Sequence, residues 1–287
     1  MTQARALRLL GLAVLLFGGV WPVTKHALAE ASPLWFGFGR AALAALSAAA
    51  VLGALGRLRW PGREDLPALL AVGLLQIGAF FALAHLALAF VPAGRTAILG
   101  NVTIFWLVPL SVLLLRERVS ARRWAAAALG LAGVAAMTGP WAFDWSAPGM
   151  LAGHGLLLLA SLAWSLAIIA TRLRPPRAPM LELLPFVFAL GALLILPFAL
   201  AREPGGGVGA PAWPALLFIG LVAAPVGTWA VIEAGRHLNA VLASLGFLLV
   251  PVVGVALATL WLHEPLGWDL LLGGALVVAS VALAAKG

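Results

Sequence analysis

Ten long apolar runs divide this chain, and they constrain its fold more than any other feature of the sequence. Hydrophobic residues make up 63% of the 287 residues and charged residues only 10%, whereas soluble domains carry about 25% charged residues. A helix needs about 20 apolar residues to cross the roughly 30 Å hydrocarbon core of a bilayer. The sequence therefore predicts an all-α polytopic membrane protein with ten transmembrane helices. The runs cover residues 7–28, 34–55, 66–90, 94–115, 122–138, 149–170, 181–201, 213–235, 240–262 and 267–285.

The basic residues between these runs predict the orientation of the chain. Fourteen of the eighteen Lys and Arg residues fall on one side of the predicted bundle. Lys25, Arg95 and Arg202 fall on the other side, and Arg40 lies within the second run. Cytoplasmic loops carry the excess of Lys and Arg, so we expect a multi-pass protein of the inner (plasma) membrane with both termini cytoplasmic. A net charge of +8 is then explained by orientation, and we expect no nucleic-acid partner.

The two halves of the chain resemble each other. A shift of 147 residues places His263 and Glu264 on Arg116 and Glu117, and a shift of 143 places Trp164 on Trp21. The pattern predicts two repeats, residues 1–140 and 149–287, with five spans each. Because five is odd, the second repeat enters the membrane from the opposite side. Inverted repeats are typical of alternating-access transporters that bind substrate near the midplane between the halves.

Three segments carry a resemblance to a known family. They are the stretch LFGGVWP from Leu16 to Pro22, the triplet that begins at Arg40, and the unit from Glu117 to Gly133, in which an acid precedes a helix rich in small residues. These segments resemble the EamA repeat of the drug/metabolite transporter superfamily. The resemblance covers nearly the whole chain and implies ten helices, cytoplasmic termini and secondary transport or export of small metabolites.

The sequence departs from the family pattern at three positions of the two copies. Ile104 stands where the second copy has Pro251, Ala126 stands where it has Gly273, and Ser280 replaces the final glycine. Twelve Trp and thirteen Phe residues make the chain most similar, within the superfamily, to the aromatic amino-acid exporter branch. That similarity implies an amino-acid substrate, including aromatic amino acids.

Motifs for catalysis are missing from the sequence. No phosphate-binding GxxxxGK[ST] loop, no HExxH zinc motif and no GxSxG nucleophile elbow occurs, and the chain has no Cys. We therefore expect a transporter rather than an enzyme, with no catalytic residues, no cofactor and no metal, and with the lipid bilayer and a small-molecule substrate as partners. The alternatives are a membrane-embedded enzyme of unrecognised type, a passive channel or scaffold, and an exporter of aromatic cations and other drugs.

Polar residues within a span are expensive, so each requires a structural or functional reason. Together with aromatic residues on the inner spans, they form the predicted substrate site. The candidate substrate-binding residues are Trp21, Pro22, Arg40, Gln76, Phe80, His85, Asn101, Phe105, Ser161, Trp164, Ser165, Trp229 and Ser244.

Several of these residues have a second interpretation. Arg40 binds a substrate carboxylate, extends to the headgroups, or pairs with Glu30. Pro22 frees the carbonyl of Gly18 and so kinks or breaks the first span, exposing backbone groups to a ligand. Alternatively, Gly18 serves only close helix packing. Lys25 is expected to extend to the headgroups.

The remaining polar residues allow predictions from helical periodicity. Gln76 and His85 are nine residues apart, about 180° around an ideal helix, so we expect them on opposite faces. Asn101 shares a face of the fourth span with Phe105, where it orients a substrate amino group or links two helices. Glu233 is expected to pair locally with Arg236 and His237.

The pair Trp21 and Trp164 gives the most specific hypothesis. Positions that are equivalent in inverted repeats lie symmetrically about the central axis, so both rings would face the cavity if one does. A flat aromatic substrate can then stack between or against them. The competing interpretation is that both rings fill matching gaps in the helix bundle.

Overall fold

The computed structural model describes residues 2–139, 141–142, 146–238, 246–247 and 249–285. Apart from one bridge between Ala31 and Val208, these described residues form helices and the loops that join them. The α-helices are α1 (Gln3–Ala27), α2 (Pro33–Ala54), α3 (Leu66–Leu70), α4 (Phe80–Leu88), α5 (Ala93–Leu99), α6 (Ile104–Leu114), α7 (Ala121–Thr138), α8 (Met150–Leu173), α9 (Met180–Arg202), α10 (Trp213–Leu217), α11 (Ala224–Gly235), α13 (Leu249–Leu262) and α14 (Trp268–Ala285). The described residues also form two π-helices, η1 (Ala71–Ala79) and η3 (Phe218–Ala223), and a 3₁₀ turn, η2 (Ala210–Ala212).

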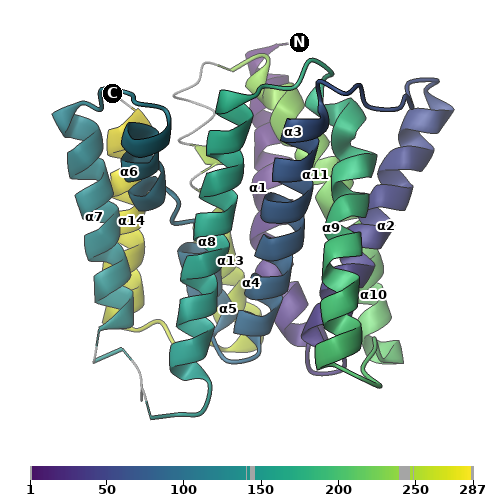
Figure 1. Ribbon diagram of the computed structural model, residues 1–287. Coiled ribbons are helices and arrows are strands. Elements are labelled where there is room, and N and C mark those ends of the chain that lie inside the picture. The colour runs from purple at the N-terminus through teal and green to yellow at the C-terminus, as the bar shows by residue number, and fades with distance from the viewer. Residues whose placement is uncertain (1, 140, 143–145, 239–245, 248, 286–287) are drawn as a thin grey trace.

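The helices form an upright bundle in which α1 begins and α14 ends at the same end (Figure 1). The loops at that end carry most of the arginines, and we call it the Arg-rich end. Its thirteen described arginines are Arg5, Arg8, Arg57, Arg59, Arg63, Arg116, Arg118, Arg122, Arg123, Arg172, Arg174, Arg177 and Arg236. The charge pattern of the sequence therefore correctly predicts that the two ends of the helical chain lie on one side.

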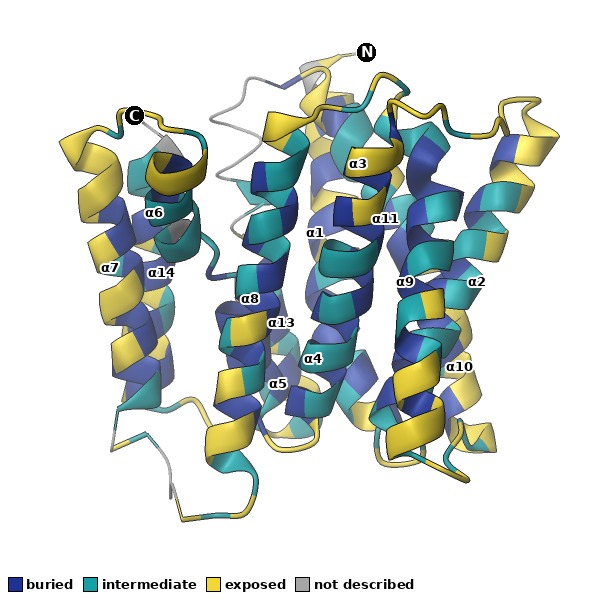
Figure 2. Ribbon diagram, in the orientation of Figure 1, coloured by how far each residue is buried: buried dark blue, intermediate teal, exposed yellow. Residues whose placement is uncertain are grey.

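Among the described residues, six stretches of helix are long and apolar enough to cross a membrane by themselves. They are Ala4–Ala27, Pro33–Ala54, Leu66–Leu88, Met150–Leu173, Met180–Arg202 and Ala210–Gly235. Three shorter apolar helices, Phe105–Leu114, Leu249–Leu262 and Trp268–Ala284, lie beside them. Peripheral helices such as α7 bury one face against a neighbour and leave the other exposed (Figure 2). This exposed apolar surface is what a bilayer covers.

The two halves of the chain repeat each other in structure. Helices α1 and α8 begin 147 residues apart, as do α2 and α9, α3 and α10, and the π-helices η1 and η3. Arg116 and His263, also 147 residues apart, are the two non-glycine residues with positive φ in the described chain, at 54° and 55°. Helix α1 starts at the Arg-rich end and α8 at the other end (Figure 1). The equivalent helices thus run in opposite directions.

The common offset of 147 corrects the sequence register of the two tryptophans. Under that offset Trp164 corresponds to Phe17 rather than to Trp21. The register differs by four residues, which is about one turn of a helix. Trp21 therefore lies on the face of α1 that corresponds to the face of α8 occupied by Trp164, although the two positions are not equivalent.

Two spans differ from their sequence prediction. Helix α1 is continuous from Gln3 to Ala27 with Pro22 inside it, so of the two predicted effects of Pro22, a kink or a break, the break is wrong. The predicted fourth span is instead interrupted between α5 and α6, at residues 100–103. Gly18 allows close packing of α1 against α13. A Cβ at this position would lie 2.9 Å from the carbonyl oxygen of Val250 in α13.

Acidic side chains of each half bind helix starts of the other half. The Glu203 carboxylate accepts hydrogen bonds from the backbone N–H groups of Leu34 and Trp35 at the start of α2, at 3.1 and 3.2 Å. At the Arg-rich end, Asp65 accepts from the N–H groups of Arg177 and Ala178 just before α9, at 2.7 and 2.9 Å. Carboxylates at helix N-termini satisfy free N–H groups and the helix dipole. The halves are therefore joined at both ends of the bundle.

Replacement of Gly133 by Ala is expected to destabilise the pair formed by α7 and α14. The new Cβ would lie 2.8 Å from the carbonyl oxygen of Gly273 and 2.9 Å from Val277 Cγ2, and such overpacking costs about 1–3 kcal/mol. Thermal unfolding in detergent measures the effect. Gly11→Ala is the matched control, because no heavy atom lies within 4 Å of its Cβ and Ala favours a helix. Equal melting temperatures of the two variants would contradict the prediction.

Asp65 is expected to make the stability of the protein pH-dependent in acid. Hydrogen bonds from the backbone N–H groups of Ala178, Arg177 and Gly62 lower the pKa of this carboxyl below its usual value of 3.8, with burial opposing them. The stabilisation is complete above the pKa of the unfolded chain and is lost as the pH falls through the lower folded-state pKa. The melting temperature of the wild type should therefore fall more steeply below pH 4 than that of Asp65→Asn, and parallel curves would refute this.

Candidate functional site

The interruption between α5 and α6 lies near the middle of the bundle. Helix α5 ends at Leu99, residues 100–103 form a turn, and α6 begins at Ile104. Seven residues of α5 rise about 10 Å at 1.5 Å per residue, which places the turn well inside the predicted membrane region. Broken helices expose backbone groups to ligands at this depth, and transporters use them for substrate binding.

Three aromatic rings from three helices meet beside this turn. Phe80 of α4 contacts Trp164 of α8 edge to face, with ring centroids 4.8 Å apart, and contacts Trp21 of α1 at 6.2 Å. A Cβ on Gly100 would lie 3.3 Å from the Trp21 ring. The structure thus brings the two predicted tryptophans together through Phe80, which occupies the position between them, and Trp164 remains half-buried.

The polar face of α8 lies against the same turn. Ser165 Oγ donates to the Ser161 carbonyl at 2.8 Å and approaches the Thr103 carbonyl at 3.4 Å. Ser161 Oγ accepts a hydrogen bond from Trp106 Nε1 at 3.0 Å, and the Trp106 ring lies 4.5 Å from Phe105. Both serines are fully buried. Their hydroxyls therefore link α8 to the α5–α6 turn and fix the aromatic side chains of α6.

Two polar side chains keep hydrogen-bonding capacity that no other described residue uses. Asn101 Nδ2 donates to the Ala97 carbonyl at 2.7 Å and so caps α5, while its side-chain oxygen makes no hydrogen bond with another described residue. Gln76, half-buried in η1, makes none either. Thr103 does not cap α6 with its side chain, which leaves N–H groups of its first turn available. A free amide oxygen and an uncapped helix start can receive an ammonium and a carboxylate.

The expected face shared by Asn101 and Phe105 does not exist, because Asn101 lies in the turn rather than on a continuous helix. The ideal α-helical angle of about 180° between Gln76 and His85 does not apply to this segment. Gln76 belongs to the π-helix η1, whose hydrogen bonds span five residues and whose turn is wider than that of an α-helix.

Arg40 and His85 form a buried contact between α2 and α4. Arg40 Nη1 lies 3.2 Å from His85 Nε2, and its guanidinium carbon lies 4.0 Å from the Phe81 ring centroid. Because guanidinium only donates hydrogen bonds, His85 Nε2 accepts and Nδ1 carries the proton. Arg40 is 8% exposed, so the two alternatives of extension to the headgroups and pairing with Glu30 are wrong. Phe81 connects this contact to Phe80 at 6.2 Å.

Lys25 and Glu264 close the bundle at the end opposite the Arg-rich end. Lys25 does not extend to the headgroups as the sequence predicted, because its ammonium donates to the carbonyls of Leu88 and Val91. The Glu264 carboxylate accepts from the N–H groups of Ala93 and Gly94 at the start of α5. Helices α1, α4, α5 and α13 are thereby held together between the candidate site and this end.

Trp229, one of the predicted residues, lies apart from the cluster. Trp229 of α11 is 44% exposed and lines hollows nearer the Arg-rich end with Glu233. Ser244 lies outside the described residues. Glu233 contacts Arg236 at 3.4 Å and His237 at 3.3 Å, as predicted for a local surface pair. Pro22 is buried within α1, one position after Trp21.

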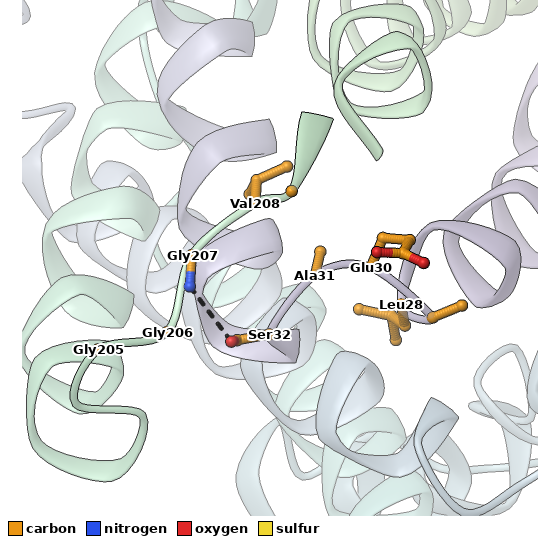
Figure 3. A pocket seen from close by; sticks show the side chains of 10 residues that line it. Leu28, Glu30, Ala31, Ser32, Gly205, Gly206, Gly207 and Val208 are labelled. Carbon is orange, nitrogen blue, oxygen red and sulfur yellow. Dashed lines mark hydrogen bonds between the residues drawn. The ribbon is translucent and has the colours of Figure 1, made fainter. Parts of the chain in front are cut away.

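A separate hollow of about 440 Å³ lies between the loops 28–32 and 205–209 (Figure 3). Its backbone groups are mostly engaged: Ser32 N–H donates to Gly207, Gly209 N–H donates to Glu30, and Gly207 N–H donates to Ser32 Oγ. Glu30 is the one charged residue among those that line it. The hollow lies between the two loops. The polar and aromatic groups of a substrate site do not line it.

Three residues of the cluster are missing from the list of candidate substrate-binding residues, namely Phe81, Thr103 and Trp106. A signal for the turn existed, since Gly100 and Asn101 are turn-forming residues and Thr103 is a common N-cap type. Trp106 lies deep within its span, but its bond to Ser161 depends on how α6 and α8 pack. Phe81 becomes relevant only because Arg40 reaches it from another helix.

Comparison with known proteins identifies the family. The chain is 28% identical to the uncharacterized transporter YvbV of Bacillus subtilis (strain 168), covering 98% of this chain and 92% of that protein. It is 25% identical to a probable terminal-alkyne amino-acid exporter of Streptantibioticus cattleyicolor, covering 99% and 94%. A solved structure titled "Crystal structure of protein" shares the fold, with a TM-score of 0.68 and 21% identity over 97% and 95% of the chains. The EamA-like transporter family matches residues 5–139 and 151–285. This chain belongs to the EamA-like transporter family.

Proposed function

We propose that this transporter exports small organic metabolites, namely amino acids including aromatic ones, by alternating access. In this proposal ten spans form two inverted five-helix units, residues 1–140 and 149–287, in the plasma membrane with both termini cytoplasmic. The observation that carries the proposal is the broken helix α5–α6 beside Trp21, Phe80 and Trp164. The printed name of the exporter from Streptantibioticus cattleyicolor supports an amino-acid substrate.

The chemistry of the broken helix suits a zwitterion. The uncapped start of α6 offers N–H groups and a positive helix dipole to the substrate carboxylate. The side-chain oxygen of Asn101, which makes no hydrogen bond with another described residue, offers an acceptor to the ammonium group. An aromatic or apolar substrate side chain then packs against Phe80 and Trp164, with Gln76 and Phe105 completing the site.

An exporter of aromatic cations is the second candidate function, since aromatic rings bind cations through their faces. A cation site inside a membrane is favoured by a neighbouring carboxylate. The described residues of this cluster include no Asp or Glu. Arg40, linked to the cluster through Phe81 and Phe80, adds positive charge instead. This arrangement favours the zwitterion over the cation.

Counterflow in proteoliposomes tests the proposal. Vesicles loaded with one amino acid should take up the same labelled amino acid without ATP, with aromatic amino acids competing best in a panel that includes aromatic cations. Measurements with and without a pH gradient report on proton coupling. Transport that requires ATP would overturn alternating access by a secondary transporter. Counterflow with cations alone would overturn the amino-acid assignment in favour of the second candidate.

A further inference from the structure

Two hollows meet at Trp229 near the Arg-rich end of the bundle. The first, of about 660 Å³, lies between α1 and α11 and is lined by Arg5, Arg8, Leu9, Leu12, Trp229 and Glu233. The second, of about 350 Å³, lies between α2, α9 and α11, where Val51, Leu55, Leu184, Leu221 and Pro225 contribute apolar surface. Trp229 and Glu233 line both hollows. The indole therefore separates two adjoining spaces on the outer surface of the bundle.

The charges at these hollows are unbalanced. Arg57 binds Glu182 at 2.7 Å and Arg236 binds Glu233 at 3.4 Å, so the second hollow has a nearly neutral rim. Arg5 and Arg8 are exposed, and neither makes an ion pair with another described residue. The first hollow thus presents two guanidinium groups outside any ion pair among the described residues, and its one carboxylate, Glu233, is paired with Arg236 and His237.

We infer that the two hollows hold one anionic phospholipid, with an acyl chain on each side of Trp229 and the phosphate on Arg5 and Arg8. Apolar residues line the deeper parts of both hollows, while the basic residues lie at the end of the bundle where headgroups would be found. Guanidinium groups form strong charged hydrogen bonds with phosphate. Indoles prefer the interface between the acyl chains and headgroups.

The phosphate provides the selectivity of this site. An acyl chain gains little by moving from the bilayer into an apolar groove, because both surroundings are equally apolar. Basic pockets between transmembrane helices select lipids by the charge of the headgroup. The site is separate from the substrate cluster, since the residues that line the two hollows include no member of that cluster. The inference depends on membrane embedding and not on the identity of the substrate.

Lipid titration of the purified full-length protein in detergent tests this inference. The affinities for dioleoylphosphatidylglycerol and dioleoylphosphatidylcholine are measured by native mass spectrometry or by intrinsic Trp fluorescence. We expect the anionic lipid, dioleoylphosphatidylglycerol, to bind about tenfold more tightly. Arg5→Gln with Arg8→Gln should remove this preference. Arg59→Gln with Arg63→Gln removes the same charge from the same end outside the hollows and should retain it. Trp229→Leu, which leaves the charge unchanged, should retain the preference for the anionic lipid.

Three results would overturn the inference. The first is an unchanged lipid preference in the Arg5/Arg8 double variant or in a second pair, Arg5→Ala with Arg8→Ala. The second is an equal loss in the Arg59/Arg63 control, which would indicate general attraction to a positive surface. The third is competition by soluble glycerol 3-phosphate at the same concentration as the lipid, which would indicate a site for free phosphate. Because no transport is measured, failure here leaves the proposed function untouched.

Discussion

Trp164→Ala and Trp21→Ala are each expected to weaken the binding of an aromatic substrate by about tenfold, or about 1.4 kcal/mol. Both rings contact Phe80 beside the α5–α6 turn, and an aromatic pair contributes about 0.5–1.5 kcal/mol beyond its buried area. Phe at either position should restore most of the affinity, because it retains an aromatic face. Binding and melting temperature are measured on the same purified variants.

The competing interpretation of these two tryptophans is packing, and the measurement separates the two. If the rings only fill space, the alanine variants lose thermal stability while the surviving protein binds substrate normally. Normal affinity in a destabilised Trp164→Ala would therefore refute a role in substrate binding. Trp124→Ala is the matched control, because Trp124 is 47% exposed on α7 and has no aromatic neighbour among the described residues. It should change neither quantity appreciably.

Arg95→Met is expected to destabilise the protein by about 3–5 kcal/mol, because it leaves a buried carboxylate without its partner. Arg95 of α5 is 8% exposed, and it binds Asp269 at the start of α14, which is 5% exposed. Arg95 also donates to the Met137 carbonyl of α7 at 2.8 Å. The arginine thus ties together three helices, and loss of the guanidinium also leaves that carbonyl unsatisfied.

Thermal or denaturant unfolding in detergent measures this loss. Replacement of both partners, Arg95→Met with Asp269→Leu, should recover most of the stability, since no charge then remains buried. Arg202→Met is the control, because Arg202 is exposed at the same end of the bundle. Wild-type stability of Arg95→Met would show that the ion pair contributes nothing. Equal stability of the single and double variants would show that the buried carboxylate is not the cause.

Much of the fold follows from the sequence, because it depends on local properties of the chain. A long apolar run has one favourable state in a bilayer, which is a helix whose backbone groups bond within the segment. The positions of the arginines predicted that both ends of the helical chain lie together, and the structure confirms this. Similarity between Glu117 and Glu264 revealed the offset of 147 that the helix starts reproduce. The match of the EamA-like transporter family to residues 5–139 and 151–285 confirms the resemblance seen in the sequence.

Only the tertiary structure decided which helix breaks and which polar groups meet. Pro22 predicted a break in the first span, yet α1 is continuous while α5 and α6 separate at Gly100 and Asn101. A proline frees one carbonyl, and whether the helix continues depends on what packs against it. Here α13 packs closely against Gly18, so neighbouring residues determine a feature that propensity alone assigned wrongly.

The partners of buried polar residues were likewise beyond the sequence. Arg40 meets His85 at a separation of 45 residues, and Glu264 reaches the start of α5 from 171 residues away. The high free-energy cost of an unpaired polar group in a membrane favours partners for such residues. It does not specify the partners, because that choice depends on which helices lie side by side. The sequence by itself therefore determined the membrane helices, their repeat and their orientation relative to each other, and the packing of distant helices determined the site.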